Sequence, residues 1–76
     1  METNRQMGPP VKEGDKFLLD IEGFGKRGDP FGKVTGFVLF IRLNPEEIVK
    51  ENEKYWVEVT RVFSSHAFAV LSEEPK

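Results

Sequence analysis

One segment of this chain, dense in both glycine and phenylalanine, most constrains its fold. Residues 23–40 read GFGKRGDPFGKVTGFVLF and hold five glycines and four of the seven phenylalanines in the 76-residue chain. Glycine weakens helices and permits backbone conformations with positive φ, so no long helix is expected here. The short apolar runs between the glycines instead predict short strands joined by tight loops.

Alternation of apolar and polar residues predicts further strands around this segment. In residues 16–22 and 55–62, apolar and polar side chains alternate, which is typical of strands with one face in water. In the second run, Arg61 is predicted on the same face as Val57 and Val59. Together the apolar runs predict five strands, at residues 16–22, 31–34, 37–41, 55–62 and 66–71, with residues 23–30 as a long, mobile hairpin loop.

Residues 43–53 are the one stretch that carries helix signals. Asn44 can cap a helix, Pro45 suits its first position, and Glu46 and Glu47 favour its first turn. Only one or two turns fit this length. The sequence therefore predicts an all-β fold, a five-stranded OB-like small barrel with a short helical turn between the third and fourth strands. An SH3-like barrel is the alternative.

The length predicts a single domain with short tails, because 76 residues lie near the lower limit for a self-sufficient core. Residues 1–10 are expected to form a flexible N-terminal tail, residues 11–72 the barrel, and residues 73–76 a C-terminal tail. The chain begins without the apolar stretch of a secretion signal, and no apolar run approaches the ~20 residues of a membrane span. We expect a cytoplasmic protein with no membrane partner.

The residue types exclude most site chemistry. The chain has no cysteine and one histidine, which excludes disulfides and thiolate metal sites, and no cofactor is expected. His66 follows Ser64 and Ser65, but that spacing does not aim the ring at both a serine and a carboxylate. The GxGxxG pattern at residues 23–28 has no helix behind it, so it is not a dinucleotide site. We expect no enzyme activity and no catalytic residue.

Charge is unevenly distributed along the chain, although the net charge is only −2. Residues 25–42 carry four cations against the single acid Asp29, whereas residues 43–53 carry four glutamates against Lys50. The molecule is therefore expected to have one positive and one negative region. Near-neutrality overall predicts modest, salt-sensitive binding to nucleic acid, since few phosphates can be neutralised at once.

The spaced pattern of the chain resembles the TRAM domain over residues 11–71. The matching pieces are Val11-Lys12-Glu13-Gly14-Asp15, Ile21-Glu22, Gly28-Asp29, Lys33-Val34-x-Gly36-Phe37-Val38-x-Phe40 and Ala67-Phe68-Ala69. The resemblance implies a five-stranded OB-like barrel that binds RNA. TRAM domains are appended to RNA methyltransferases and methylthiotransferases that modify tRNA. Stand-alone archaeal TRAM proteins of this size look like RNA chaperones that fill the role of cold-shock proteins, and this class is the expected match.

Two departures from the family pattern stand out. Between the third and fourth strands the family usually has a short connection of the type GAxPGE, whereas residues 43–53 are longer and more acidic. Before Ala67 the stand-alone proteins often have an aromatic residue, and here His66 keeps a flat ring. The first departure affects the local conformation, and the second leaves a stacking surface in place.

Cations and aromatic rings near the glycine-rich segment form the predicted RNA site. Lys26, Arg27 and Lys33 are the expected phosphate contacts, with Arg42 and Arg61 as weaker candidates; the competing interpretation is a solvated loop that keeps the protein soluble. Aromatic rings offer faces on which unpaired bases stack. The predicted RNA-binding set is Lys26, Arg27, Phe31, Lys33, Phe37, Arg42, Arg61, His66 and Phe68.

The aromatic residues are assigned to faces by alternation. In the strand at 37–41, Val38 and Phe40 are predicted to point inward, which turns Phe37 and Leu39 outward. The predicted core consists of Phe17, Ile21, Val34, Phe40, Val57 and Val59.

In the strand at 66–71, small side chains indicate the inner face. Ala67 and Ala69 fit a crowded interior, which turns His66 and Phe68 outward. The alternative is that Phe68 and Phe37 are core and the alanines face water.

The predicted function is binding of single-stranded or structured RNA, including tRNA, by a monomeric RNA chaperone that melts or remodels RNA without chemistry. The alternative is a protein-interaction module, with an apolar patch of Phe37 and Leu39, or an RNA-docking accessory subunit of an RNA-modifying enzyme. Salt separates RNA binding from the protein-interaction module, because RNA affinity falls with ionic strength and apolar association does not.

Overall fold

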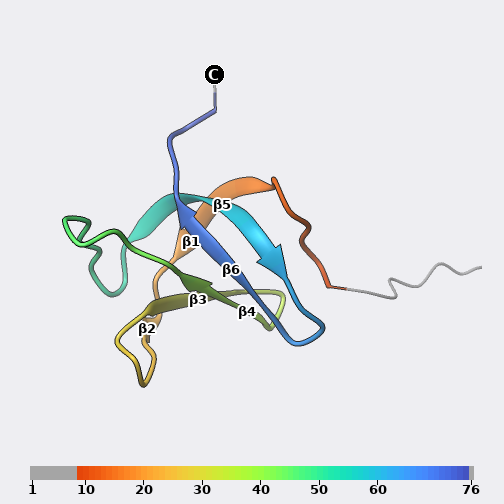
Figure 1. The fold of residues 1–76 in the computed structure, drawn as a ribbon, viewed down its shortest axis with the longest axis horizontal. Helices are drawn as coiled ribbons and strands as arrows, with labels where there is room; N and C mark the ends of the chain where they lie inside the picture. The colour runs from red at the N-terminus through yellow and green to blue at the C-terminus, as the bar shows by residue number, and fades with distance from the viewer. Residues whose placement is uncertain (1–8, 76) are drawn as a thin grey trace, which may run out of the picture.

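The computed structural model describes residues 9–75 as an all-β small barrel (Figure 1). One six-stranded sheet, with the order β1-β5-β6-β4-β3-β2, curls into a half-barrel. Every pairing in it is antiparallel except that of β4 with β6, which is parallel. The strands are β1 (Lys16–Asp20), β2 (Gly23–Phe24), β3 (Pro30–Val34), β4 (Phe37–Ile41), β5 (Lys54–Val62) and β6 (His66–Leu71).

Five of these strands are the predicted ones, and β2 is additional. It occupies the start of the segment predicted as a mobile loop and pairs with β3. Residues 25–29 form a tight turn, because the Gly25 amide donates to the Asp29 carbonyl at 2.8 Å and the Gly28 amide to the Gly25 carbonyl at 2.9 Å. Gly28 has a φ of 87°, which explains the glycine at this position.

The sheet curls because its two ends are consecutive in the chain. Only two residues separate β1, at one end of the sheet order, from β2 at the other. β3 therefore crosses close to β1, where a Cβ atom on Gly32 would collide with the carbonyl oxygen of Asp20 and with the Leu19 side chain. Glycine at position 32 lets β3 pass this close to β1.

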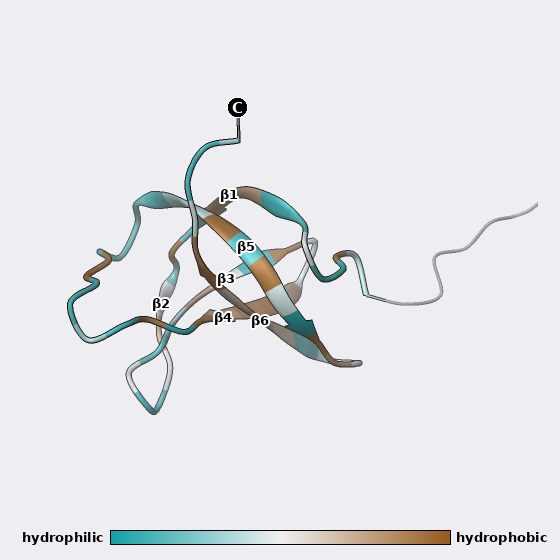
Figure 2. Cartoon of the chain, turned by 45° about the horizontal axis from the view of Figure 1, so that its top comes forward, coloured by the Kyte–Doolittle hydropathy of each residue, from teal (hydrophilic) through white to brown (hydrophobic). Residues whose placement is uncertain are grey.

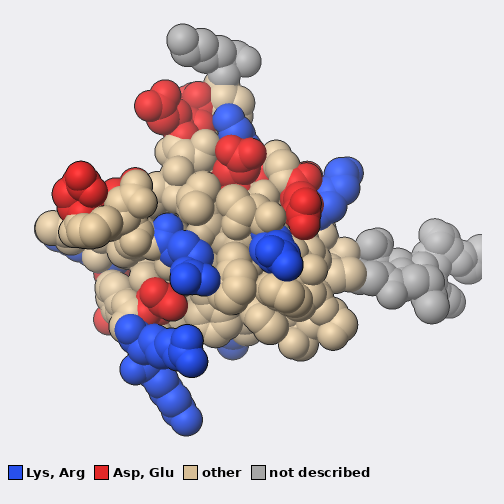
Figure 3. Space-filling view, viewed as in Figure 1, with Lys and Arg blue, Asp and Glu red and all other residues tan. Residues whose placement is uncertain are grey.

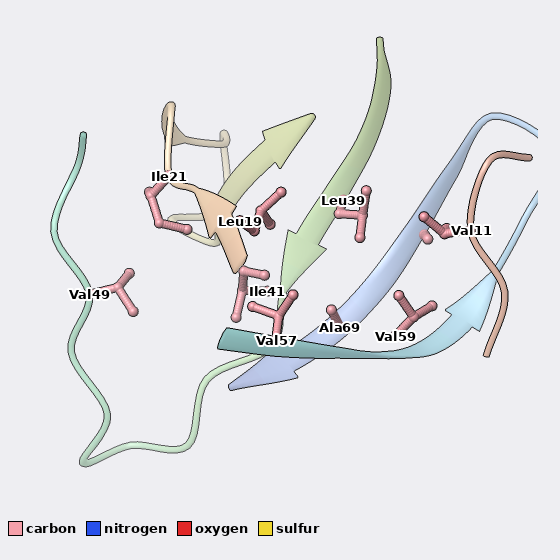
Figure 4. Packing of buried hydrophobic residues seen from close by; sticks show 10 residues of the cluster. Val11, Leu19, Ile21, Leu39, Ile41, Val49, Val57, Val59 and Ala69 are labelled. Carbon is pink, nitrogen blue, oxygen red and sulfur yellow. The ribbon is translucent and has the colours of Figure 1, made fainter. Parts of the chain in front are cut away.

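Aliphatic side chains and two alanines fill the interior (Figure 4). The predictions of Ile21, Val57 and Val59 as core are confirmed, and Phe17 and Val34 are partly buried against the same cluster. The buried hydrophobic residues are Val11, Leu19, Ile21, Leu39, Ile41, Val49, Val57, Val59, Ala67 and Ala69.

The predicted facing of β4 was wrong. Leu39 and Ile41 point inward with 0% exposure, so Val38 and Phe40 point outward, and Phe37 packs partly buried against the core. β4 is apolar along its whole length, whereas β5 changes repeatedly between apolar and polar residues (Figure 2). A strand without alternation gives no sign of which side is buried.

The predicted facing of β6 is correct. Ala67 and Ala69 are fully buried, and His66 and Phe68 lie on the outer face. Alanine suits this position because the parallel pairing sets Ala67 beside Leu39 and Ala69 beside Ile41 in the interior. Small residues beside large ones let the layers fill the space without voids.

The predicted face of Arg61 was wrong because β5 contains a β-bulge. Val59 pairs with Ala69 and Arg61 with Phe68, which leaves Thr60 as the extra residue. The bulge reverses the alternation beyond it, so Arg61 is exposed opposite Phe68 while Val62 packs against the core.

The helical turn predicted within residues 43–53 does not form, and no helix occurs among residues 9–75. The helix signals produce an isolated turn, in which the Glu47 amide donates to the Asn44 carbonyl and the Asn44 amide to the Glu47 carboxylate. Beyond it, Val49 enters the core and the Lys50 amide donates to the Tyr55 hydroxyl at 2.8 Å. A single helical turn contributes little stability alone, so these tertiary contacts determine the local conformation.

All six strands lie within the predicted barrel at residues 11–72. Most of the predicted N-terminal tail, residues 1–8, and the last residue of the predicted C-terminal tail lie outside the described residues. Among residues 9–75, no helix has the length and apolar character that a membrane crossing requires.

Candidate nucleic-acid interface

Strand register places aromatic side chains in a row across the outer face of β3, β4 and β6. Phe31 pairs with Phe40, and Phe40 with Phe68. Directly paired residues point to the same side of a sheet, so the three rings share one face. Arg61, paired with Phe68, extends this row onto β5.

A second row lies one pleat away on the same strands. It contains Lys33, Val38 and His66, since Lys33 pairs with Val38 and Val38 with His66. The two rows meet through ring contacts around Phe40, whose centroid lies 6.1 Å from that of His66, 6.2 Å from Phe31 and 6.4 Å from Phe68. Phe40 is therefore the centre of the aromatic surface.

Phe63 extends this surface beyond the end of β5. Its ring stacks on His66 with centroids 4.8 Å apart and 23° between the planes, and meets Phe68 edge-on at 5.5 Å. Phe63 is 38% exposed, so part of its ring is available to a ligand. A hydrogen bond from its amide to the His66 carbonyl holds it at the base of the turn.

Two guanidinium groups lie over these rings. The Cζ atom of Arg42 is 5.1 Å from the Phe68 centroid, and that of Arg61 is 5.7 Å from the Phe63 centroid. Both distances are within cation–π range. Each arginine thus places a positive charge and a flat surface beside an aromatic ring.

A groove of about 550 Å³ runs over this face. The turn between β2 and β3 forms one wall and brings Lys26 and Arg27 to the groove; it sits so close that a Cβ on Gly25 would lie 3.4 Å from the Phe40 ring. The lining residues are Gly25, Lys26, Arg27, Asp29, Phe31, Val38, Phe40, Arg42, His66 and Phe68.

Positive charge gathers around the groove. Blue side chains in Figure 3 project from the turn at lower left and lie over the centre of the same face, while acidic side chains lie mainly toward its margins. Among residues 9–75, the cations of this face form no ion pair. The salt bridge found within these residues joins Lys54 of β5 to Asp20 of β1 at 3.3 Å, outside the groove. The one acid in the groove wall is Asp29.

The groove brings together six of the nine predicted site residues, namely Lys26, Arg27, Phe31, Arg42, His66 and Phe68. Lys33 lies beside the groove, because it pairs with Val38 in the groove wall. Arg61 lies at the border of the groove, over the ring of Phe63. Phe37 does not join them, since it packs against the core. No group of three or more metal-ligating side chains occurs among the described residues.

Sequence reasoning missed Phe40, Val38 and Phe63 as parts of this face. For the first two the cause is the reversed facing of β4. Phe63 carried a usable signal, because it is an aromatic residue directly before the Ser64-Ser65 turn and three positions from His66. Aromatic residues at both ends of so short a turn are brought together by it.

Comparison with known proteins gives the chain a family. The uncharacterized protein MJ0660 of Methanocaldococcus jannaschii is 42% identical over 60 residues, which cover 79% of this chain and 71% of that protein. This chain belongs to the MJ0660 family. A conserved protein from the gene locus MMP0076 of Methanococcus maripaludis, known from its solution structure, matches with a TM-score of 0.72 and 30% identity over 87% of each chain.

The chain is also similar to part of a larger enzyme. The ribosomal RNA large subunit methyltransferase E of Methanosarcina barkeri is 38% identical over 64 residues, and that of Methanosarcina mazei is 36% identical over 64. The match covers 84% of this chain but only 22% of each methyltransferase. No protein-family model matches the chain, so TRAM membership stays a prediction.

Proposed function

We propose that this MJ0660-family protein binds single-stranded RNA and acts as an RNA chaperone that melts or remodels RNA structure without chemistry. The observation that carries the proposal is the aromatic row Phe31–Phe40–Phe68 in a groove bordered by cations. Stacked bases and neutralised phosphates are the two requirements of single-strand binding, and this face supplies both.

In this proposal, unpaired bases stack on the outward-facing, partly exposed rings. A duplex hides the faces of its bases, so only a splayed strand can use the row from Phe31 to Phe68. Lys26 and Arg27, on the turn that walls the groove, contact the phosphates on one side. Few side chains in the groove can read base edges, so sequence preference is weak.

Arg42 and Arg61 add a second stacking surface. Each guanidinium already lies over a ring, and arginine planes stack on bases much as aromatic rings do. An arriving base lies against the guanidinium or displaces it toward a phosphate. In both cases the ring and the charge act on the same nucleotide.

Trapping unpaired bases is sufficient for chaperone activity. A protein that binds only the open form of an RNA hairpin shifts the population toward that form by its difference in affinity for the two states. The similarity to ribosomal RNA methyltransferases and the resemblance to TRAM domains favour RNA over DNA as the ligand, with rRNA and tRNA as candidate targets in the cytoplasm.

A second candidate is an RNA-docking accessory role for an RNA-modifying enzyme. It is favoured by the observation that nearly the whole chain matches a small part of a methyltransferase. The apolar docking patch of Phe37 and Leu39 does not exist, because Leu39 is fully buried. An accessory role would use the same groove for RNA. It differs from the chaperone role in requiring a partner enzyme.

The test is binding and melting with the purified protein. We expect a fluorescently labelled single-stranded RNA to bind more tightly than a blunt duplex of the same sequence in a polarisation assay. We also expect a quenched RNA hairpin to open on addition of the protein alone. Equal or tighter binding of the duplex would contradict the stacking mechanism, and binding without opening would favour the accessory role.

A further inference from the structure

A second face of the barrel carries apolar residues that the RNA groove does not use. On the outer side of β1 and β5, Leu18 pairs with Trp56, and Val70 on β6 lies next to Glu58. Leu18 is 49% exposed, a high value for a large aliphatic side chain on a strand. None of these four residues lines the groove, and Arg61, which borders it, lies farther along β5.

Opposite charges flank this apolar pair on both sides. Lys16 pairs with Glu58 at one end, and Asp20 pairs with Lys54 at the other, with a salt bridge of 3.3 Å. We define the β1–β5 patch as these six residues: Lys16, Leu18, Asp20, Lys54, Trp56 and Glu58.

We propose that the β1–β5 patch is an interface between two copies of this chain. A two-fold axis parallel to the strands places β1 of one copy opposite β5 of the other. Residues that pair within one copy then lie at the same position along the strands. Lys16 then faces Glu58, Leu18 faces Trp56, and Asp20 faces Lys54, each of them twice. Every charge meets its opposite, which is the self-complementarity that an isologous interface requires.

The orientation of the axis follows from side-chain size. An axis across the strands would also match the charges, but it would set Trp56 against Trp56 and hold the two convex sheets apart. The axis along the strands sets each Trp56 against the smaller Leu18. This packing is the closer of the two, because large against small lets the surfaces interdigitate.

The patch is small, so the dimer is weak. Three positions on each of two strands span roughly 14 by 5 Å, well below the ~800 Å² per partner of a standard stable interface. Association therefore occurs at high protein concentration or when one RNA bridges two copies. No residue of the patch lines the groove, so the dimer would have two RNA sites and higher avidity for long strands.

Sedimentation equilibrium of the whole chain tests the interface. We expect the apparent mass to rise from monomer toward dimer between ~20 µM and ~1 mM, as for a dissociation constant in the micromolar to millimolar range. Leu18→Glu should hold the protein monomeric throughout. Ile48→Glu is the matched control, because Ile48 is 81% exposed and lies outside the patch, and it should associate like the wild type.

Charge reversal tests the orientation. Glu58→Lys should weaken association at least tenfold, and adding Lys16→Glu to it should restore association, because the swapped pair still matches across an axis along the strands. A wild-type protein that stays monomeric at ~1 mM, or a Glu58→Lys variant that associates normally, would overturn the proposal. A double variant that stays monomeric would overturn the orientation.

The outcome is independent of the RNA proposal. Leu18→Glu should bind a short RNA with unchanged affinity, and Phe40→Ala should associate like the wild type. Loss of RNA binding in Leu18→Glu would show that the two faces are not separate.

Discussion

The groove face and the β1–β5 patch belong to the same curled sheet but differ in how they use charge. Over the groove, the arginines lie on aromatic rings, and among residues 9–75 no cation of that face is paired with an acid. On the patch each cation lies beside an acid on the neighbouring strand. Cations without acidic partners attract a polyanion, whereas paired charges favour a surface of the same kind. Aromatic residues on an outer face alone therefore do not mark a nucleic-acid site; the charges beside them decide.

The largest expected effect comes from the core that supports both faces. Leu39→Ala should cost ~2–5 kcal/mol of unfolding free energy, because Leu39 is fully buried at the centre of the sheet. That is a large share of the stability of so small a domain, so both faces should fail together. Chemical denaturation measures the loss; a Leu39→Ala protein as stable as the wild type would contradict the described facing of β4.

Phe40→Ala separates the faces. Removing the central ring should lower the affinity for single-stranded RNA by ~1–3 kcal/mol per stacked base, while the fold survives because the ring lies on the outer face. Leu18→Ala on the patch is the matched control and should leave RNA affinity unchanged. Polarisation titrations with one short RNA compare the two; equal losses in both variants would remove the distinction between the faces.

Arg42→Lys keeps the positive charge beside Phe68 and removes the flat guanidinium. If the stacking of Arg42 on Phe68 contributes, RNA affinity should fall by ~0.5–2 kcal/mol without change in the salt dependence. Arg42→Ala should lose at least as much and also flatten the salt dependence. Full affinity in Arg42→Lys would mean that the guanidinium acts only as a charge.

Lys26→Ala combined with Arg27→Ala tests the turn that walls the groove. Each lost phosphate contact should reduce the slope of log affinity against log salt by ~0.7 for a single strand, so the pair should reduce it by ~1.4. The loss should be uniform across RNA sequences. An unchanged slope would show that the turn does not touch phosphate.

The smallest effect is expected on the patch. Lys54→Ala removes an exposed salt bridge, whose side chains are each 63% exposed, and should change stability by less than ~1 kcal/mol. RNA affinity and its salt slope should not change. A marked loss of RNA binding in Lys54→Ala would mean that the RNA path crosses both faces.

The sequence predicted the barrel because its strands are short and bounded by glycine or turn residues. It also predicted the facing of β6, where alanine alternates with large residues. The facing of β4 was not predictable in the same way, since Phe37 to Ile41 are all apolar. Which side is buried depends on the pairing of β4 with β6, which sets Leu39 beside Ala67.

Two further errors arose from tertiary contacts. The bulge at Thr60 adds one residue to β5 and turns Arg61 outward, and an alternating sequence does not show where a bulge will form. Asn44 and Glu47 make two hydrogen bonds that close a single turn, but burial of Val49 draws the chain away from a helix. In both places long-range contacts produced a structure other than the one that the local sequence pattern predicted.

The most direct test of the central claim is an NMR titration of the labelled protein with a short single-stranded RNA, at one fixed protein concentration. We predict that the ring resonances of Phe31, Phe40, Phe63, His66 and Phe68 shift as bases stack on them, while the Trp56 indole signal stays in place. Shifts at Trp56 and Leu18 with the groove rings unchanged would contradict the assignment of the RNA site.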